Sequence, residues 1–230
     1  MKRLSIGAAL LLAGSMISGT AYAENPPPAG PVIFSLDGQP IPHTYTNYTV
    51  NFTANAAVTN LAFALREDPA YFSLDNITLT TGGGPNLVTN GDFEAGPIGA
   101  NQPNGWTYLN LYNAGAAGRV LSGCGIGGSN CYYDGAVGSY DTITQAINTS
   151  IGSLYTLNFW LTDNSSQVTA SAMNNGNLSG INLVVYAGAA QVTAGGVPEP
   201  ATWAMMLVGF GAIGGTLRRR QNVATRVRFA

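Results

Sequence analysis

Few side chains in this sequence are of the types that do chemistry, and most of those are acids and aromatics. The one histidine, His43, lies in a turn-like segment, and no G-x-S-x-G elbow provides a nucleophile for it. Close acids occur as Glu67-Asp68 and as Asp92 with Glu94, and either pair could in principle serve a glycosidase. A turn before a proline explains the first pair more simply, and a strand end or calcium site explains the second. We therefore expect no catalytic residue and no enzyme activity.

Two cysteines, Cys124 and Cys131, stand in a glycine-rich stretch. In an oxidising compartment, two cysteines this close on a flexible loop are most simply a disulfide, and a free pair is the alternative. A zinc site needs more ligands than these cysteines and one histidine supply. The pair therefore predicts a disulfide staple rather than metal-thiolate chemistry.

Aromatic residues are the candidates for ligand binding. A sugar ring has an apolar C–H face and a rim of hydroxyls, so a glycan site needs exposed aromatic faces beside polar groups. The candidate glycan-binding residues are Trp106, Tyr108, Tyr112, Tyr132 and Tyr133. Packing in the core or on a sheet surface is the alternative, and for Trp106 core burial is the favoured interpretation.

The elements that must position these residues are strands. Apolar residues alternate with polar ones in 48–52, 61–65, 155–161 and 181–185, and no stretch has the period of a long amphipathic helix. The pattern predicts an all-β fold, a jelly-roll-type β-sandwich over residues 24–196. A glycine-rich break at 82–85 divides it into segments 31–80 and 86–190. The first segment is too short to be stable alone, so we expect the two to pair in one domain.

Two segments resemble exported carbohydrate-binding proteins. Residues 86–94, Asn-Leu-Val-Thr-Asn-Gly-Asp-Phe-Glu, followed by Gly105-Trp106, are similar to the opening strand of galactose-binding-like jelly rolls. Residues 61–79 are similar to the closing pair of strands in such proteins. Because the closing pair comes first here, the resemblance implies a circularly permuted sandwich or tandem partial modules.

This resemblance also implies a structural calcium ion, which jelly rolls of this class often hold beside the opening and closing strands. If the two segments pair, Asp75, Asp92 and Glu94 would supply carboxylate oxygens, the ligands that calcium prefers. Solvated acids at strand ends are an equal alternative. No other cofactor is expected.

The N-terminal residues are typical of a secretion signal. Lys2 and Arg3 precede an apolar run, which ends at small residues with Ala21 and Ala23 in an A-x-A cleavage site. The run is short for a membrane span, which needs about 20 apolar residues. We therefore assign residues 1–23 to a signal peptide that signal peptidase removes.

Residues 197–230 have the features of a membrane-held tail. An apolar segment at 201–217 is just long enough to span a bilayer as a helix, and the arginines after it would stay in the cytoplasm. A plain single-span anchor is one interpretation. The tail resembles, however, the PEP-CTERM sorting signal of Gram-negative bacteria, through Pro198-Glu199-Pro200, Trp203 and Arg218-Arg219-Arg220. That resemblance implies a transient inner-membrane anchor and processing by an exosortase near the triplet.

The net charge of the exported part limits the kinds of molecule it can bind. Residues 24–196 contain two arginines, no lysine and ten acids, a net charge of −8. Such a domain cannot neutralise a row of phosphates, so nucleic acid is excluded as a partner.

These observations predict a non-catalytic exported protein of the cell surface or extracellular matrix of a Gram-negative bacterium. The PEP-CTERM resemblance implies an association with exopolysaccharide and biofilm, and glycan is the expected ligand. A self-associating structural or adhesive protein without a ligand is the alternative, and a polysaccharide-acting enzyme is a further one. Exposed tyrosines would favour binding, a flat polar face with an unpaired edge strand would favour assembly, and a buried acid pair in a cleft would favour catalysis.

Overall fold

The computed structural model describes residues 25–36, 39, 41–67, 71–163, 181–193 and 210. The signal peptide assigned to 1–23 lies outside the described residues. So does the sorting tail assigned to 197–230, residue 210 excepted. Within the described part of the chain, no helix is both long and apolar enough to cross a membrane.

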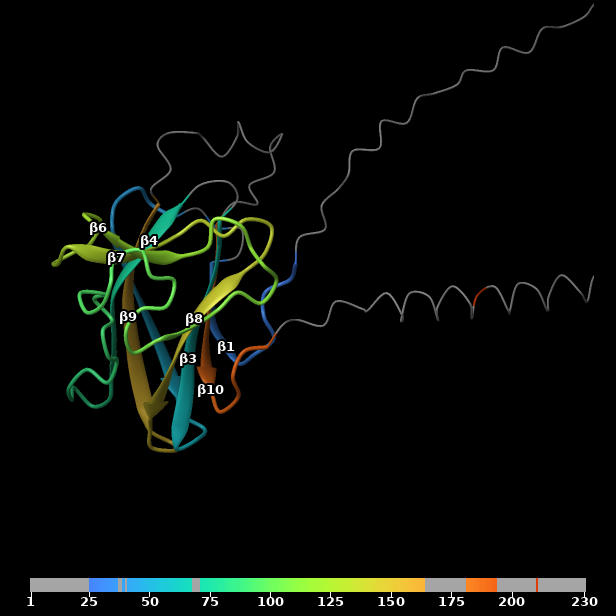
Figure 1. Cartoon of the computed structure of the whole chain (residues 1–230). Helices are drawn as coiled ribbons and strands as arrows, with labels where there is room; N and C mark the ends of the chain where they lie inside the picture. Colours follow the sequence, from blue (N-terminus) through green and yellow to red (C-terminus); the bar gives the residue numbers. More distant parts are fainter. Residues whose placement is uncertain are drawn as a thin grey trace, which may run out of the picture.

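In the described residues, ten strands form two five-stranded antiparallel sheets that pack face to face (Figure 1). The first sheet has the order β1 (Val32–Ser35), β10 (Ile181–Gly188), β3 (Val58–Glu67), β8 (Asp141–Asn148), β5 (Thr107–Leu109). The second has the order β2 (Thr46–Thr53), β9 (Leu154–Asp163), β4 (Phe72–Thr80), β7 (Asn130–Asp134), β6 (Arg119–Ser122). The predicted all-β sandwich is confirmed.

The core lies where the predicted apolar faces of the strands meet. Phe63 of β3 and Phe159 of β9 come from different sheets and are both fully buried, with ring centroids 5.4 Å apart. Tyr48 of β2 stacks on Phe159 at 5.6 Å. Burying a side chain of this size contributes roughly 2–3 kcal/mol, so this aromatic cluster joins the two layers.

Segments 31–80 and 86–190 interleave in both sheets. β3 of the first segment lies between β10 and β8 of the second, and β4 lies between β9 and β7. Neither segment could close a sheet without the other, because each supplies central strands to both layers. The pairing expected of them is therefore present, whereas the circular permutation stays a prediction.

The predicted opening strand at 86–94 is not a strand in the structure, and this expectation was wrong. The segment runs beside β4 as a loop, where Asn86 Oδ1 accepts the Leu79 backbone N–H at 2.9 Å. Asn90 and Phe93 have positive φ values of 51° and 55°, a left-handed conformation that no regular strand contains. Side-chain hydrogen bonds thus take the place of part of the ladder that the resemblance implied.

The two ends of the sandwich domain meet. Ala29 and Thr193 form an isolated antiparallel bridge with hydrogen bonds of 2.9 and 3.1 Å in the two directions. The buried hydroxyl of Tyr186 donates to the Pro28 carbonyl at 2.7 Å. The described chain therefore enters and leaves the domain at one place, beside β10.

Candidate functional site

Two of the predicted glycan-binding residues belong to the core. Trp106 is 3% exposed, and its indole Nε1 donates to the Asn90 carbonyl at 3.1 Å. Tyr132 is fully buried, and its hydroxyl donates to the Asn101 carbonyl at 3.0 Å. Because a sugar cannot reach a ring inside the sandwich, the assignment of Trp106 and Tyr132 to glycan binding was wrong. Core packing, already favoured for Trp106, accounts for both.

Tyr108 and Tyr112 are half-buried. The Tyr108 hydroxyl donates to Asp141 Oδ2 at 3.0 Å, and burial, followed by the charge of Asp141, raises the pKa of Tyr108 well above its usual value. Tyr112 lies close enough to the buried Tyr186 to act on the pKa of that phenol, after the larger effect of burial. The polar end of Tyr108 is thus turned toward an interior acid, which makes it a poor ligand contact.

Tyr133 is the predicted residue that stacks on another half-buried aromatic ring, that of Tyr71. It lies on β7 between Ser73 of β4 and Arg119 of β6, its two antiparallel partners. Because its neighbour Tyr132 points into the core, Tyr133 points outward from the sheet. Its ring stacks on Tyr71, with centroids 4.7 Å and planes 11° apart. We call Tyr71, Tyr133 and Arg119 the tyrosine platform.

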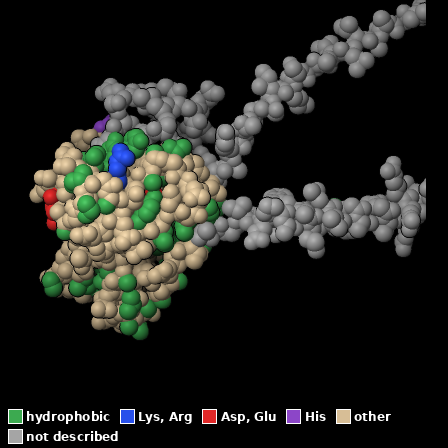
Figure 2. All heavy atoms as spheres, in the orientation of Figure 1, with side chains coloured by type: hydrophobic (Ala, Val, Ile, Leu, Met, Phe, Trp, Pro, Cys, Tyr) green, Lys and Arg blue, Asp and Glu red, His purple; other side chains and the backbone are tan. Residues whose placement is uncertain are grey.

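The charges around the platform show that its three members act on one another. Partial burial raises the pKa of Tyr133, the Tyr71 phenol raises it further, and the Arg119 guanidinium lowers it. Of the two described arginines, Arg66 is 4% exposed and lies over the Tyr140 ring, whereas Arg119 is exposed. Figure 2 shows a basic side chain with hydrophobic side chains around it on the visible face. The platform thus combines ring surface with a planar hydrogen-bond donor.

Tyr71 and Arg119 were not among the predicted ligand-binding residues. They are distant from each other in the sequence, and only the order β4-β7-β6 brings them to opposite sides of Tyr133. One signal was available: Arg119 is one of only two basic residues between 24 and 196. The sequence does not show, however, that Arg119 pairs with Tyr133 across two strands.

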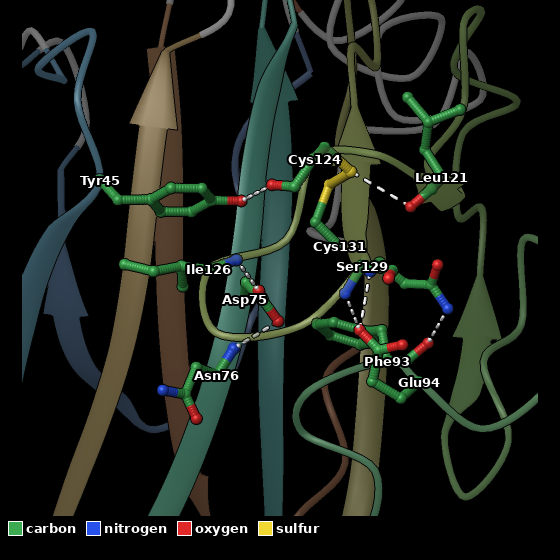
Figure 3. Close-up of a disulfide and its surroundings, with 11 residues drawn as sticks. Tyr45, Asp75, Asn76, Phe93, Glu94, Leu121, Cys124, Ile126, Ser129 and Cys131 are labelled. Atoms are coloured by element: carbon green, nitrogen blue, oxygen red, sulfur yellow. Dashed lines mark hydrogen bonds between the residues drawn. A yellow bond between two sulfur atoms is a disulfide. The ribbon is translucent and has the colours of Figure 1, made fainter.

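The predicted disulfide is present. Cys124 and Cys131 are bonded, with Cα atoms 5.5 Å apart, and they close the loop that precedes and enters β7. Tyr45 reaches this loop from the segment before β2, and its hydroxyl donates to the Cys124 carbonyl at 2.6 Å (Figure 3). The staple therefore fixes the loop against the outer face of the second sheet.

Two acids hold the same loop through their carboxylates. Asp75 Oδ2 accepts the Ile126 backbone N–H at 2.6 Å. Glu94 Oε1 accepts the backbone N–H groups of Ser129 and Asn130 at 2.6 and 2.7 Å (Figure 3). Hydrogen bonds to an ionised acceptor are roughly twice as strong as neutral ones, so the pair fastens the loop from both sides.

The structure gives two of the acids assigned to calcium, Asp75, Asp92 and Glu94, another use. Calcium takes roughly 6–8 oxygen ligands from carboxylates, carbonyls and water. The oxygens of Asp75 accept N–H groups from Asn76 and Ile126, and burial raises its pKa to about 7 although these hydrogen bonds lower it. Among the residues that the structure describes, no three histidine, cysteine or acidic side chains gather for a metal. Asp75 and Glu94 hold the disulfide loop, and the calcium ion stays a prediction.

A second acid pair, Asp134 of β7 with Asp141 of β8, is buried in the molecule and was not singled out from the sequence. Asp141 Oδ2 accepts the Gly118 N–H at 2.8 Å, and Asp134 Oδ1 accepts the Ala136 N–H at 2.8 Å. Burial raises the pKa of both carboxyls, and the charge of Asp141 raises that of Asp134 further. Asp134 Oδ2 and Asp141 Oδ1 have no other partner. Burial therefore favours the protonated form of this pair.

A groove lies apart from the tyrosine platform and from the buried acid pair. It has a volume of about 360 Å³, follows β8 beyond its pairing with β5, and is lined by Leu87, Thr89, Gly105 and residues 145–148. None of these side chains is an acid, a histidine or a cysteine. The buried acid pair is fully covered and does not line this groove, so the two do not form one site.

Comparison with known proteins identifies the tail. A family model, the PEP-CTERM protein-sorting motif, matches residues 196–221 and contains the Pro198-Glu199-Pro200 triplet and the three arginines. No curated protein and no solved structure matches the chain. The motif implies an exported protein that has a C-terminal membrane anchor before an exosortase processes it.

Proposed function

We propose that this protein is a non-catalytic surface or matrix protein whose sandwich binds glycan through the tyrosine platform. The observation that carries the proposal is the stacked pair of half-buried rings, Tyr71 and Tyr133, beside the exposed Arg119. The sorting motif supports a location outside the inner membrane, where exopolysaccharide is the polymer that the protein would meet.

The chemistry of the platform suits a sugar. Each pyranose ring packs its C–H face on aromatic surface, and its hydroxyls accept hydrogen bonds from planar donors such as a guanidinium. Arg119 would also attract a carboxylate, while the other charges of the domain are mostly acidic. The platform therefore favours a polymer that is neutral or carries isolated uronate groups.

The positions of the acids support a non-catalytic role. A glycosidase needs two carboxyls on either side of a bond that the substrate can bring between them. Asp134 and Asp141 are covered by the protein, and Glu94 accepts two backbone N–H groups of the disulfide loop. These three acids thus have structural uses in the fold.

A glycan array, followed by a pull-down with the host's exopolysaccharide, tests the proposal with the full chain in detergent. Tyr133→Ala should weaken binding at least about tenfold, because it removes the stacked ring and its apolar contact. Tyr133→Phe should retain most of the affinity, since the ring remains. Tyr112→Ala tests the half-buried candidate outside the platform, and it should bind as the unchanged protein does if the platform alone is the site.

Two results would contradict the proposal. Binding that survives both Tyr71→Ala and Tyr133→Ala would place the glycan site elsewhere. Release of reducing ends from the bound polymer would show that the protein is an enzyme.

A further inference from the structure

Among the described residues, β2 is an edge strand with no strand paired to one of its sides. It pairs with β9 over all eight residues, Thr46 to Thr53, without a bulge. Its sequence, Thr-Asn-Tyr-Thr-Val-Asn-Phe-Thr, contains no charge and no proline. Edge strands usually carry a lysine, a proline, a bulge or a cover that prevents pairing with another chain. β2 carries none of the first three.

The backbone groups on the free side can be assigned from the ladder. Ala54 N–H donates to the Ser153 carbonyl at 3.0 Å, so Ala54 faces β9. Hydrogen-bonding direction alternates along an antiparallel strand, so the even-numbered residues of β2 also face β9. The free side therefore presents the N–H and C=O groups of Asn47, Thr49, Asn51 and Thr53. No other segment of the described residues forms a backbone hydrogen bond with them.

We propose that β2 pairs with β2 of a second copy of this chain, antiparallel and centred on Val50. In this register Asn47 of one copy lies opposite Thr53 of the other, and Thr49 lies opposite Asn51. All four free residues then form hydrogen-bonded pairs, which gives about eight backbone hydrogen bonds and one continuous sheet through both molecules. The contact is isologous and closes on itself, so it produces a dimer rather than a fibre.

The side chains of β2 are complementary to themselves in this register. On the inner face, Tyr48 of one copy meets Phe52 of the other, which pairs two aromatic rings at the rim of the cores. On the outer face, Thr49 and Asn51 already form a polar ladder with β9, since Thr49 donates to Asn158 at 2.7 Å and Thr156 donates to Asn51 at 2.8 Å. The second copy extends this Thr-Asn ladder.

The charge of the domain allows two copies to meet at this edge. Residues 24–196 carry a net charge of −8, so two copies repel each other where acids are brought close. β2 has no charged residue, and at an ionic strength of 0.15 M repulsion is screened beyond about 8 Å. β2 and β6 are also opposite edges of one sheet, so pairing through β2 leaves both tyrosine platforms open. The dimer would present two glycan sites to one polymer.

Hydrogen exchange on the full chain in detergent tests the proposal at two protein concentrations, together with sedimentation. Amides of Asn47, Thr49, Asn51 and Thr53 should become protected as the concentration rises. Amides of Tyr48, Val50 and Phe52 are already paired with β9 and should not change with concentration. This alternation separates pairing through β2 from association through the apolar tail.

Thr49→Pro removes an N–H that does not pair with β9, so the fold should tolerate it at an edge. Each dimer loses two hydrogen bonds, and its dissociation constant should rise about 30-fold.

Charged variants test the register. Thr49→Lys and Asn51→Asp should each weaken the dimer, while a mixture of the two variants should form heterodimers in which the Lys and Asp side chains face each other.

We expect the odd-numbered amides to become protected as the concentration rises, and this protection to be lost in Thr49→Pro. Dimer formation should recover when the Thr49→Lys and Asn51→Asp variants are mixed. Odd-numbered amides that exchange equally fast at both concentrations would overturn the proposal. A dimer that persists unchanged in Thr49→Pro would overturn it as well, because the contact would then lie outside β2. Neither result depends on whether the platform binds glycan.

Discussion

Substitution of Asp75 by Asn should remove a large part of the dependence of stability on pH. Asp75 is 1% exposed on β4, under the disulfide loop. Burial is the largest cause that raises its pKa from 3.8 to about 7, and the charges of Asp92 and Glu94 add to the rise. Asparagine has nearly the same shape and no proton to lose in this range. The variant therefore removes the ionisation, together with one of the two hydrogen bonds that Asp75 accepts, and the loss of that bond does not depend on pH.

The sign and size follow from linkage. Because the folded pKa lies above the unfolded one, the stabilising contribution is present below a pH of about 4 and is lost as the pH rises through about 7. At about 1.36 kcal/mol per pH unit of difference, the loss amounts to at most about 4 kcal/mol. This is a large fraction of a typical free energy of unfolding, roughly 5–15 kcal/mol.

The assay is urea unfolding of the full chain in detergent from pH 4 to pH 8, for the unchanged protein and for Asp75→Asn. The difference between their unfolding free energies should change in favour of the variant across this range. Asp92→Asn is the control, an exposed neighbour whose charge is removed while Asp75 can still ionise. A difference that is constant with pH, or that changes in the opposite direction, would refute the assignment of this pKa to Asp75.

Two other predictions concern the disulfide loop. Glu94→Gln should speed exchange of the Ser129 and Asn130 amides at least about tenfold, since it weakens two charge-assisted hydrogen bonds, and amide exchange measured by NMR checks this. An exchange rate equal to that of the unchanged protein would show that Glu94 does not hold these two amides. A chelator should leave the melting temperature unchanged if Asp75 and Glu94 hold the loop without an ion, because their carboxylates already accept its backbone N–H groups. A drop of several degrees that calcium reverses would contradict this reading.

The sequence predicted the parts of the fold that depend on local periodicity. Alternation placed Phe63 and Phe159 in the core, and the close spacing of Cys124 and Cys131 predicted their bond. The strand at 86–94 was predicted from a family resemblance and is a loop in the structure, because side-chain hydrogen bonds such as those of Asn86 compete with a ladder.

The candidate site was predicted only in part, because it depends on strand order. Tyr133 was named from its type and from its place beside the cysteine loop, but so was Tyr132, which points to the opposite side of the same strand. A shift of one residue exchanges core and surface, and the sequence around these adjacent tyrosines does not fix that choice. Tyr71 and Arg119 required knowledge that β4 and β6 flank β7.

The acids connect the stability of the sandwich to the proposed pairing of two copies. A formal charge of −8 counts every acid as ionised, yet burial raises the pKa of Asp134 and Asp141, and that of Asp75 to about 7. The folded domain is therefore less negative near neutral pH than its composition suggests. Acidification protonates Asp75 within the fold, which stabilises each sandwich and also reduces the repulsion between two copies that meet at β2. A mildly acidic solution would thus favour both the folded state and the proposed dimer.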